Sequence, residues 1–209
     1  MATSEQNNKP DLQRSASLQR KTGETEISLS VTLDGQGTYQ IDTGNGFLDH
    51  MVSQIARHGL FDITLTARGD TNVGWHHLVE DVAICLGRAF GQALGEPRGI
   101  RRMGHAIVPL DETLVRVAVD WSGRGYASVE TTLDDIMVET LSGDLVSHFL
   151  ESFALEAKIN LHAKVLEGTS PHHKAEALCK ALARSLRDAI EPDPRAENQV
   201  PSTKDTLNS

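Results

Sequence analysis

His76-His77-Leu78-Val79-Glu80 has a second copy in this chain, His172-His173-Lys174-Ala175-Glu176. Both stretches follow the pattern His-His-x-x-Glu, and each is preceded by a single histidine in an apolar run. His50 comes 26 residues before His76, and His148 comes 24 residues before His172. One such stretch is a weak signal, but two copies at matched spacing indicate that the chain contains two related halves.

The spacing within each copy suits a metal site on a helix. Positions four residues apart share one face of a helix, so His76 can share a metal with Glu80, and the second copy can do the same. Adjacent positions diverge by roughly 100°, which directs the second histidine of each pair toward a different metal. The predicted ligands are His50, His76, His77, Glu80, His148, His172, His173 and Glu176.

Divided by symmetry, this set gives three histidines and one glutamate to each of two metals. Three or four protein ligands with room for a substrate are typical of a catalytic site rather than a closed structural one. The alternative is that the histidine pairs only cap or solvate the starts of two helices. The ligand types do not select one metal, because manganese, iron, cobalt, nickel and zinc all accept histidine with carboxylate.

Composition restricts the class of protein. The 209 residues carry a net charge of -9, with 39% hydrophobic and 23% charged residues, as a globular protein does. The negative charge argues against a nucleic-acid partner, and no apolar run is long enough for a membrane span. Cys85 and Cys179 fall within helical apolar patterns, which predicts buried, reduced thiols and a cytoplasmic location.

Hydrophobic periodicity predicts the same order of elements in each half: strands, a helix, a further strand and a second helix. In the first half we expect a hairpin of strands 25–33 and 38–41, a helix at 48–58, a strand at 61–67 and a helix at 76–94. In the second half we expect strands at 105–109, 114–121 and 126–132, a helix at 145–158, a strand at 159–166 and a helix at 172–190.

This order predicts an α+β fold with internally duplicated halves, each a small sheet covered by two helices. The expected segments are a disordered N-terminal tail at 1–20, a first repeat at 21–99, a second repeat at 100–190 and a C-terminal tail at 191–209.

Further motifs accompany the histidine pairs. They are residues 46–51 (Gly-Phe-Leu-Asp-His-Met), 76–81 (His-His-Leu-Val-Glu-Asp), 109–112 (Pro-Leu-Asp-Glu), 122–124 (Ser-Gly-Arg), 148–149 (His-Phe), 160–162 (Asn-Leu-His), 172–180 (His-His-x-x-Glu, with Lys180) and 201–204 (Pro-Ser-Thr-Lys). Together they resemble the imidazoleglycerol-phosphate dehydratase family of histidine biosynthesis, and the resemblance runs from about residue 20 to residue 207.

The resemblance implies a hydro-lyase that converts imidazole glycerol phosphate to imidazole acetol phosphate. It implies two manganese ions per active site, held by the eight residues above, which act as Lewis acids toward the substrate's imidazole ring. It also implies that Glu24 moves a proton during the elimination, with Glu80 and Glu176 as catalytic metal ligands. Without the resemblance, Glu24 would be interpreted as an exposed carboxylate on an edge strand.

The resemblance further implies a phosphate site made of cations and polar donors. The substrate-binding residues that match are Glu24, Arg102, Arg124, Lys180, Ser202 and Lys204. Taken alone, each cation would be interpreted as a solvated surface charge. The family also implies trimers that assemble into a 24-subunit homo-oligomer, with each site lined by more than one subunit. We therefore expect a phosphorylated imidazole as partner, and neither nucleic acid nor membrane.

The chain departs from the family pattern at four positions without losing a metal ligand. Gly74 and Asp205 replace the usual Asp and Gly, and Leu78 and Ser170 replace the usual Thr and Asn. A missing carboxylate at Gly74 would remove a group that could orient a ligand imidazole. The alternatives to a dehydratase are therefore a metal-assembled homologue with reduced or no turnover, and a di-metal hydrolase of another phosphorylated substrate.

Overall fold

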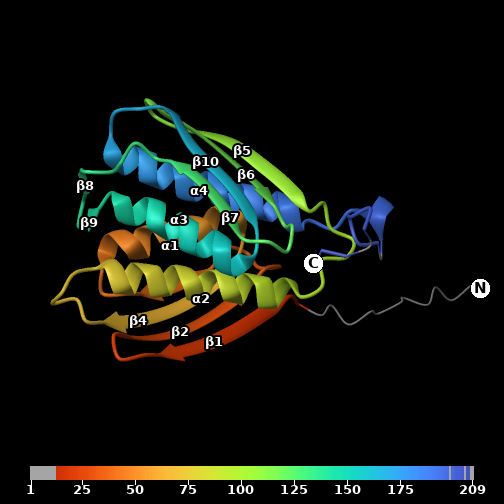
Figure 1. The fold of residues 1–209 in the computed structure, drawn as a ribbon, viewed down its shortest axis with the longest axis horizontal. Helices are drawn as coiled ribbons and strands as arrows, with labels where there is room; N and C mark the ends of the chain where they lie inside the picture. The colour runs from red at the N-terminus through yellow and green to blue at the C-terminus, as the bar shows by residue number, and fades with distance from the viewer. Residues whose placement is uncertain (1–12, 198, 205, 208–209) are drawn as a thin grey trace, which may run out of the picture.

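The computed structural model describes residues 13–197, 199–204 and 206–207. In this part of the chain, two four-stranded sheets form the outer layers and four long helices fill the space between them (Figure 1). Successive side chains of a strand point to opposite faces of its sheet. The apolar set of each sheet therefore packs on the helices, and the polar set faces outward.

The first sheet has the strand order β1-β2-β4-β3. Its strands are β1 (Ser15–Lys21), β2 (Thr25–Thr32), β3 (Tyr39–Asp42) and β4 (Asp62–Gly69). Neighbouring strands are antiparallel except for β3, which runs parallel to β4. A parallel pair needs a crossover connection, which helix α1 (Gly46–Gly59) provides. Helix α2 (His76–Leu94) follows β4.

The second sheet repeats this plan with the order β5-β6-β10-β7. Its strands are β5 (Met103–Leu110), β6 (Thr113–Asp120), β7 (Tyr126–Glu130) and β10 (Asn160–Glu167). Helix α3 (Asp144–Ala157) is the crossover, and helix α4 (Pro171–Ile190) follows β10. The additions are a short hairpin of β8 (Met137–Val138) and β9 (Leu141–Ser142), and a 3₁₀ turn at Pro194–Ala196. The matching topology confirms the predicted α+β fold with duplicated halves.

The helices of one half pack on those of the other, α1 on α4 and α2 on α3. A side chain at Gly87 would place its Cβ 2.5 Å from the carbonyl oxygen of Phe153, so glycine permits the close approach of α2 and α3. The ring of Phe90 contacts those of Phe61 and Phe153 edge-on, at centroid separations of 4.9 and 5.4 Å. This fully buried trio joins the two halves into one core.

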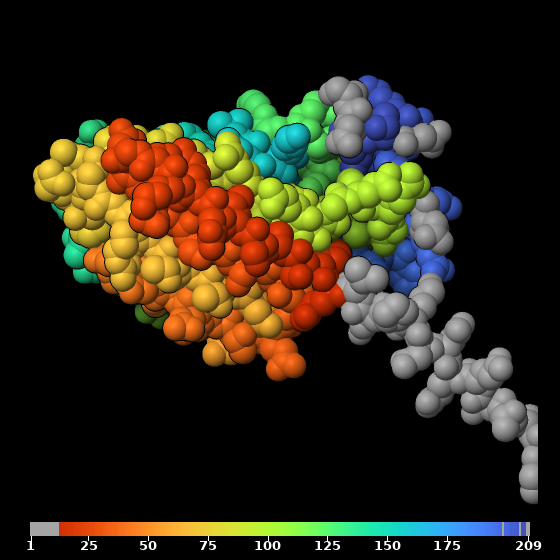
Figure 2. Space-filling model, turned by 90° about the horizontal axis from the view of Figure 1, so that it is seen from below, coloured from red at the N-terminus to blue at the C-terminus, as the bar shows by residue number. Residues whose placement is uncertain are grey.

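Figure 2 shows the outer face of the first sheet, where the exposed strand positions carry mainly polar side chains. Serine, glutamine and threonine side chains line a shallow hollow on it, at Ser17, Gln19, Ser28, Ser30 and Thr64. None of the helices in the described ranges combines the length and the apolar character that crossing a membrane requires.

Two expectations about the first half were wrong. β1 begins at Ser15, so the N-terminal tail expected at 1–20 ends earlier; residues 1–12 lie outside the described part of the chain. The two strands expected to form a hairpin are β2 and β3, and they are separated by β4. The Asp62 carboxylate accepts the backbone N–H groups of Gln36 and Thr38, both at 2.9 Å. These bonds hold the loop between β2 and β3 against the start of β4. β3 therefore pairs with the edge of β4 that lies opposite β2.

Candidate metal centre

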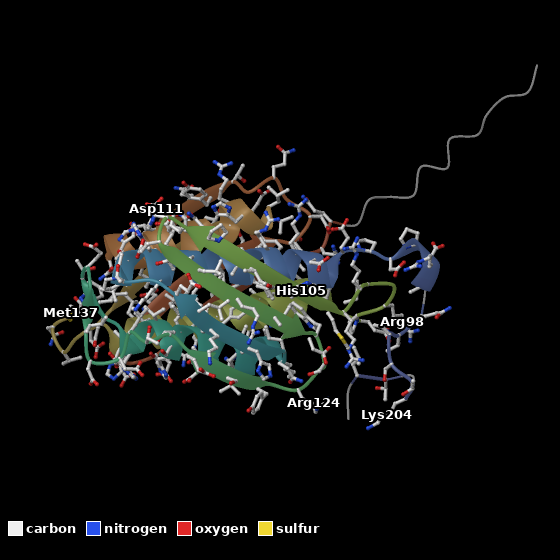
Figure 3. All side chains as sticks on the ribbon, turned by 90° about the horizontal axis from the view of Figure 1, so that it is seen from above. Arg98, His105, Asp111, Arg124, Met137 and Lys204 are labelled. Atoms are coloured by element: carbon white, nitrogen blue, oxygen red, sulfur yellow. The ribbon has the colours of Figure 1, made fainter. Side chains whose placement is uncertain are left out.

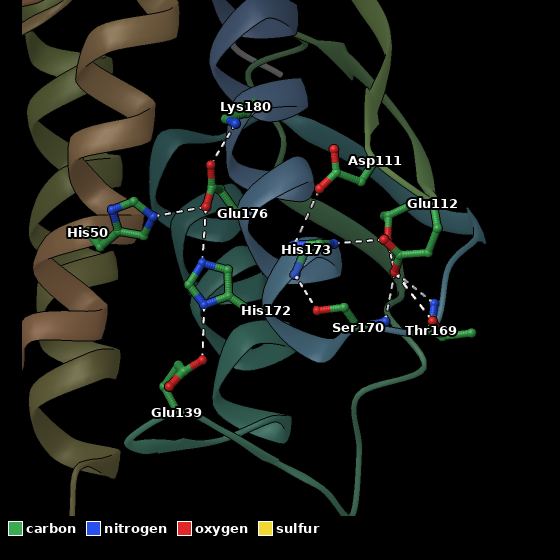
Figure 4. Close-up of polar contacts among 11 residues, drawn as sticks. His50, Asp111, Glu112, Glu139, Thr169, Ser170, His172, His173, Glu176 and Lys180 are labelled. Atoms are coloured by element: carbon green, nitrogen blue, oxygen red, sulfur yellow. Dashed lines mark hydrogen bonds and ion pairs between the residues drawn. The ribbon is translucent and has the colours of Figure 1, made fainter.

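The first group of candidate ligands lies between α1 and α4 and joins the two halves. His50 comes from α1, whereas His172 and Glu176 come from α4. The Nε2 atoms of His50 and His172 lie 2.9 and 3.1 Å from Oε2 of Glu176 (Figure 4). The three ligand atoms lie within 4.8 Å of one another, so one ion can bind all of them.

The second group has the same composition and lies between α2 and α3. His76 and Glu80 come from α2, and His148 comes from α3. Nε2 of His148 lies 3.5 Å from Oε1 of Glu80, and the rings of His76 and His148 stack with centroids 4.7 Å apart. These ligand atoms also lie within 4.8 Å of one another.

Local sequence sets where two of the ligand-bearing helices begin. The side-chain oxygen of Asn45 accepts the backbone N–H groups of the first turn of α1, at 3.1 and 3.0 Å. The hydroxyl of Ser170 accepts the N–H of His173 at 3.3 Å, and Pro171 occupies the first position of α4. Both are favourable N-terminal arrangements, and they fix the direction in which the histidines of α1 and α4 project.

The second histidine of each pair lies outside both groups. Nδ1 of His77 lies 3.1 Å from Oδ2 of Asp70, and its Nε2 lies 3.9 Å from Oε1 of Glu24. Nδ1 of His173 lies 2.7 Å from Oε2 of Glu112 (Figure 4). Within one chain, the structure therefore brings six of the eight predicted ligands into two groups and leaves His77 and His173 apart from them.

Carboxylates contact Nδ1 of three of the predicted ligand histidines. Asp70 and Glu112 do so as described above, and Oε1 of Glu139 lies 3.1 Å from Nδ1 of His172. A carboxylate at Nδ1 fixes the proton on that atom and leaves Nε2 free for a metal. The sequence pattern alone does not identify these three residues as partners of the ligand histidines. Glu112 belongs to a landmark motif, whereas Asp70 and Glu139 stand in loops whose course depends on the folded chain.

These contacts shift the protonation of the groups involved. The hydrogen bond to Asp70 raises the pKa of His77, and the hydrogen bond to Glu112 raises the pKa of His173. The same bond, followed by backbone N–H groups at the start of α4, holds the pKa of Glu112 well below its usual range. In the metal-free protein these contacts therefore favour the charged imidazoles of His77 and His173, and the contact with His173 favours the charged carboxylate of Glu112.

Glu176 is held in its ionised form beside the first group. Burial disfavours its charge, but the Lys180 ammonium and the His50 ring outweigh burial and lower its pKa to about 2. Nζ of Lys180 lies 2.5 Å from Oε1 of Glu176, one helical turn along α4. Lys180 is therefore placed beside the candidate metal ligands rather than with the other predicted phosphate residues.

Those other residues surround a cavity of about 560 Å³ at the C-terminal tail. Its lining includes Arg102, Arg124, Ser202 and Lys204. Arg102 is fixed in place, because its guanidinium lies 2.7 Å from the Asp120 carboxylate and donates to the carbonyl of Pro201 at 2.6 Å. The cavity thus combines three cations with a hydroxyl, as an anion site requires.

The cavity and the two ligand groups lie at opposite ends of the molecule. The backbone N–H of Arg102 donates to the carbonyl of Ala189, near the end of α4, whereas Glu176 lies near its start. At 1.5 Å per residue, this part of the helix spans about 20 Å. Figure 3 shows Arg124 and Lys204 at one end, with Asp111 and Met137 toward the other.

Comparison with known proteins matches this architecture. The model of the family described as imidazoleglycerol-phosphate dehydratase matches residues 43–186. A protein of that name from Dehalococcoides mccartyi is 55% identical over 194 residues, which cover 93% of this chain and 97% of the relative. Another from Roseiflexus sp. is 51% identical over 198 residues, covering 95% of this chain and all of the relative.

The chain belongs to the imidazoleglycerol-phosphate dehydratase family. Solved structures of family members share its fold. The Staphylococcus aureus enzyme has a TM-score of 0.77 at 32% identity, covering 85% of this chain and 99% of that one. The Pyrococcus furiosus enzyme has a TM-score of 0.78 at 34% identity, covering 90% and 99%.

The residues present fit the metal dependence of this family. Nε2 of His148 is buried and has no hydrogen-bond partner among the described residues, and it belongs to the second ligand group. A buried ring nitrogen without a partner is unfavourable unless another ligand satisfies it. A divalent cation between His76, Glu80 and His148 would satisfy it with the donor types such ions accept.

Three of the four departures from the family pattern are accommodated locally. Gly74 adopts φ +128°, a conformation that suits glycine, and Asp70 already contacts the Nδ1 atom of His77. Leu78 is buried, with its side chain 3.2 Å from where a Cβ of Gly69 would lie, so it belongs to the core. Ser170 caps α4 as described above. Asp205 lies outside the described residues.

Proposed function

We propose that this chain catalyses the metal-dependent dehydration of imidazole glycerol phosphate to imidazole acetol phosphate in histidine biosynthesis. One observation supports it above the others: two equivalent groups, each of two histidines and one glutamate, lie between helices of opposite halves. Such groups leave coordination positions for a substrate. The names of the relatives favour this dehydratase over an inactive homologue or a hydrolase.

We propose two manganese ions per site, one at each group, with His77 and His173 as the remaining ligands. Each group supplies two histidines and one carboxylate from within the chain. His77 and His173 lie apart from both groups, so they would complete the sites of neighbouring copies. When bound, the ions would act as Lewis acids that hold the substrate's imidazole ring and favour its imidazolate form.

The protein side chains would then bind the substrate and move the proton. The elimination removes the hydroxyl beside the ring and a proton from the next carbon, and the resulting enol becomes the ketone, with net loss of one water. Glu24 is exposed, and Nε2 of His77 approaches its carboxylate no closer than 3.9 Å. It is therefore free to carry the proton. Lys180, next to Glu176, would hold the substrate close to the ligand group.

The distance between the cavity and the ligand groups supports an active site that is built from more than one copy of the chain. A substrate of three side-chain carbons and a phosphate cannot span about 20 Å of α4. The cavity of Arg102, Arg124, Ser202 and Lys204 would therefore bind the phosphate of a substrate held by another copy. We propose the trimers and 24-subunit assembly of the family on this basis. The buried free thiols of Cys85 and Cys179 suit a reducing, cytoplasmic location.

The decisive test is an assay of chelator-stripped protein with imidazole glycerol phosphate, with and without manganese, while particle size is followed. Product that forms only with metal, together with growth of the particle, is the expected result. Assembly without product would contradict the dehydratase and favour the inactive homologue. Turnover of phosphorylated substrates that lack an imidazole ring would favour the hydrolase.

A further inference from the structure

Asp81 is a buried carboxylate that joins α2 to the hairpin between β1 and β2. It is 6% exposed. Nη1 of Arg20, on β1, lies 2.5 Å from its Oδ2 atom, and the hydroxyl of Thr25, on β2, donates a short hydrogen bond to the same oxygen. Burying a carboxylate is costly unless it is paired and hydrogen-bonded. Both strands of the hairpin are thus tied to one point on the helix.

Hydrogen bonds extend from Asp81 to the backbone of Glu24. Because the Thr25 hydroxyl donates to Asp81, it can only accept in its 3.3 Å contact with the Thr22 hydroxyl, which also lies 3.5 Å from the Thr25 carbonyl oxygen. The Thr22 oxygen in turn accepts the backbone N–H of Glu24 at 3.1 Å and that of Thr25 at 3.0 Å. The turn that carries Glu24 is therefore connected to the buried carboxylate through two hydroxyl groups.

The helix places this connection next to a predicted metal ligand. His77 and Asp81 are four residues apart, so they share one face of α2. The hairpin lies along that face, and Oε1 of Glu24 lies 3.9 Å from Nε2 of His77. Asp81 thus sets the position of the hairpin one turn beyond the histidine that Glu24 approaches.

The second half of the chain offers a natural comparison. Ala177 stands where Asp81 stands in the duplicated motif, and Val108 stands where Arg20 stands in the strand register. Both are buried apolar residues. There the counterpart of Glu24 is Glu112, which contacts Nδ1 of His173 directly at 2.7 Å. In the second half the acidic residue itself ties its hairpin to the helix, whereas in the first half Asp81 does so.

We propose that Asp81 is a positioning residue that holds the hairpin so that Glu24 can serve the substrate instead of a ligand histidine. This inference rests on the proposed function, in which Glu24 carries the proton. An acid–base group must be held within hydrogen-bond reach of the atom it serves. The direct contact that Glu112 makes would occupy Glu24, and the Asp81 network removes the need for it.

The test measures kcat and KM of the manganese-loaded full chain for Asp81→Asn, for Glu24→Gln and for the double variant. Asp81→Asn should lower kcat by about 10–100-fold, the range for groups that orient active-site residues, with a smaller change in KM. In the Glu24→Gln background, the same substitution should have little further effect. Glu156→Gln, which removes the charge from the 2.7 Å contact with Arg88 near the other end of α2, is the matched control and should leave kcat unchanged.

Thr25→Val provides a second variant, because it removes the hydroxyl connection and leaves the Arg20–Asp81 pair. Thr25→Val should lower kcat as Asp81→Asn does. In the Glu24→Gln background it should have little further effect on kcat. An equal loss of kcat with and without Glu24 would overturn the proposal, as would a loss confined to metal affinity.

Hydrogen exchange tests the positioning role of Asp81 independently of the proposed dehydratase activity. Asp81→Asn should speed the exchange of the backbone amides of residues 22–25, with the core of α2 unchanged. If the parent chain forms no product, the proposed function fails. Unchanged exchange in the hairpin of Asp81→Asn would overturn the positioning role whether or not the parent is active.

Discussion

The carboxylate of Glu112 lies 2.7 Å from Nδ1 of His173, whereas Glu24, at the equivalent place in the first half, has no such contact with its histidine. Nδ1 of His77 instead contacts the carboxylate of Asp70, which lies in the loop between β4 and α2. The two halves thus use different carboxylates to orient equivalent imidazoles. Both halves keep their candidate ligands, and one of the two hairpin carboxylates is available for another task.

Replacing Glu112 should weaken metal binding. Glu112→Gln keeps an oxygen near Nδ1 of His173 but removes the charge that orients the ring, and loss of such a partner typically lowers metal affinity 10–100-fold. Titration of the chelator-stripped protein with manganese, followed by calorimetry, would measure this. Glu130→Gln, an exposed carboxylate on β7 paired with Lys164, is the control and should bind manganese as the parent does. Equal affinities for all three proteins would contradict the orienting role.

The same pair should make the stability of the metal-free protein depend on pH. The raised pKa of His173 contributes stability that is complete below its unfolded value near 6.5 and is lost as pH rises through the folded value. The lowered pKa of Glu112 contributes stability that is complete above about 4.5 and is lost as pH falls through the folded value. Thermal unfolding should therefore show the largest advantage of the parent over Glu112→Gln between these two pH values. If the difference in stability between the parent and Glu112→Gln did not change with pH, it would contradict a charged pair of His173 and Glu112.

Removing cations from the tail cavity should weaken substrate binding more than chemistry. The double variant Arg124→Ala/Lys204→Ala would lose the two charge-assisted contacts that we propose with the phosphate, each worth about 1.5–3 kcal/mol, so KM should rise at least about tenfold per contact. Manganese affinity should stay unchanged, because the cavity lies far from both ligand groups. Arg116→Gln, on the exposed face of β6, removes a charge elsewhere and should leave KM as it is. A fall in manganese affinity would argue against a separate phosphate site.

Mixing two impaired variants with different defects should restore activity if each site uses two subunits. His148→Ala removes a ligand from the second group, and Arg124→Ala/Lys204→Ala disables the cavity. In randomly mixed assemblies, about one quarter of sites would receive an intact ligand group from one variant and an intact cavity from the other. Activity of co-expressed variants, compared with each variant alone, would measure this. A site built within one chain predicts no recovery.

Phe90→Ala should destabilise the fold strongly, because the ring is fully buried between Phe61 and Phe153. Truncation of a core phenylalanine typically costs about 3–5 kcal/mol. Denaturant unfolding of the metal-free protein would measure the loss. Val73→Ala, at a position that is 67% exposed, should change stability by less than about 0.5 kcal/mol. Similar losses for both variants would mean that the aromatic trio does not join the halves as described.

The sequence by itself predicted much of the local structure. The repeated His-His-x-x-Glu pattern indicated the duplication, because helical periodicity relates residues four apart wherever a helix forms. Helix α2 begins and ends at the predicted residues, since its periodic apolar face stops at Gly95. The pattern and the family resemblance predict the eight candidate ligands, and the spacing also separates the second histidine of each pair from the first.

Tertiary structure alone decided which parts meet. β3 lies beside β4 rather than β2, because the pairing of strands depends on the path of the loop held by Asp62 and not on their order in the chain. His50 meets His172 of the other half, because α1 packs on α4. The roles of Asp70, Glu112 and Asp81 follow from contacts between residues far apart in sequence. Periodicity specifies the face of an element, but only the packing of the whole chain specifies what that face contacts.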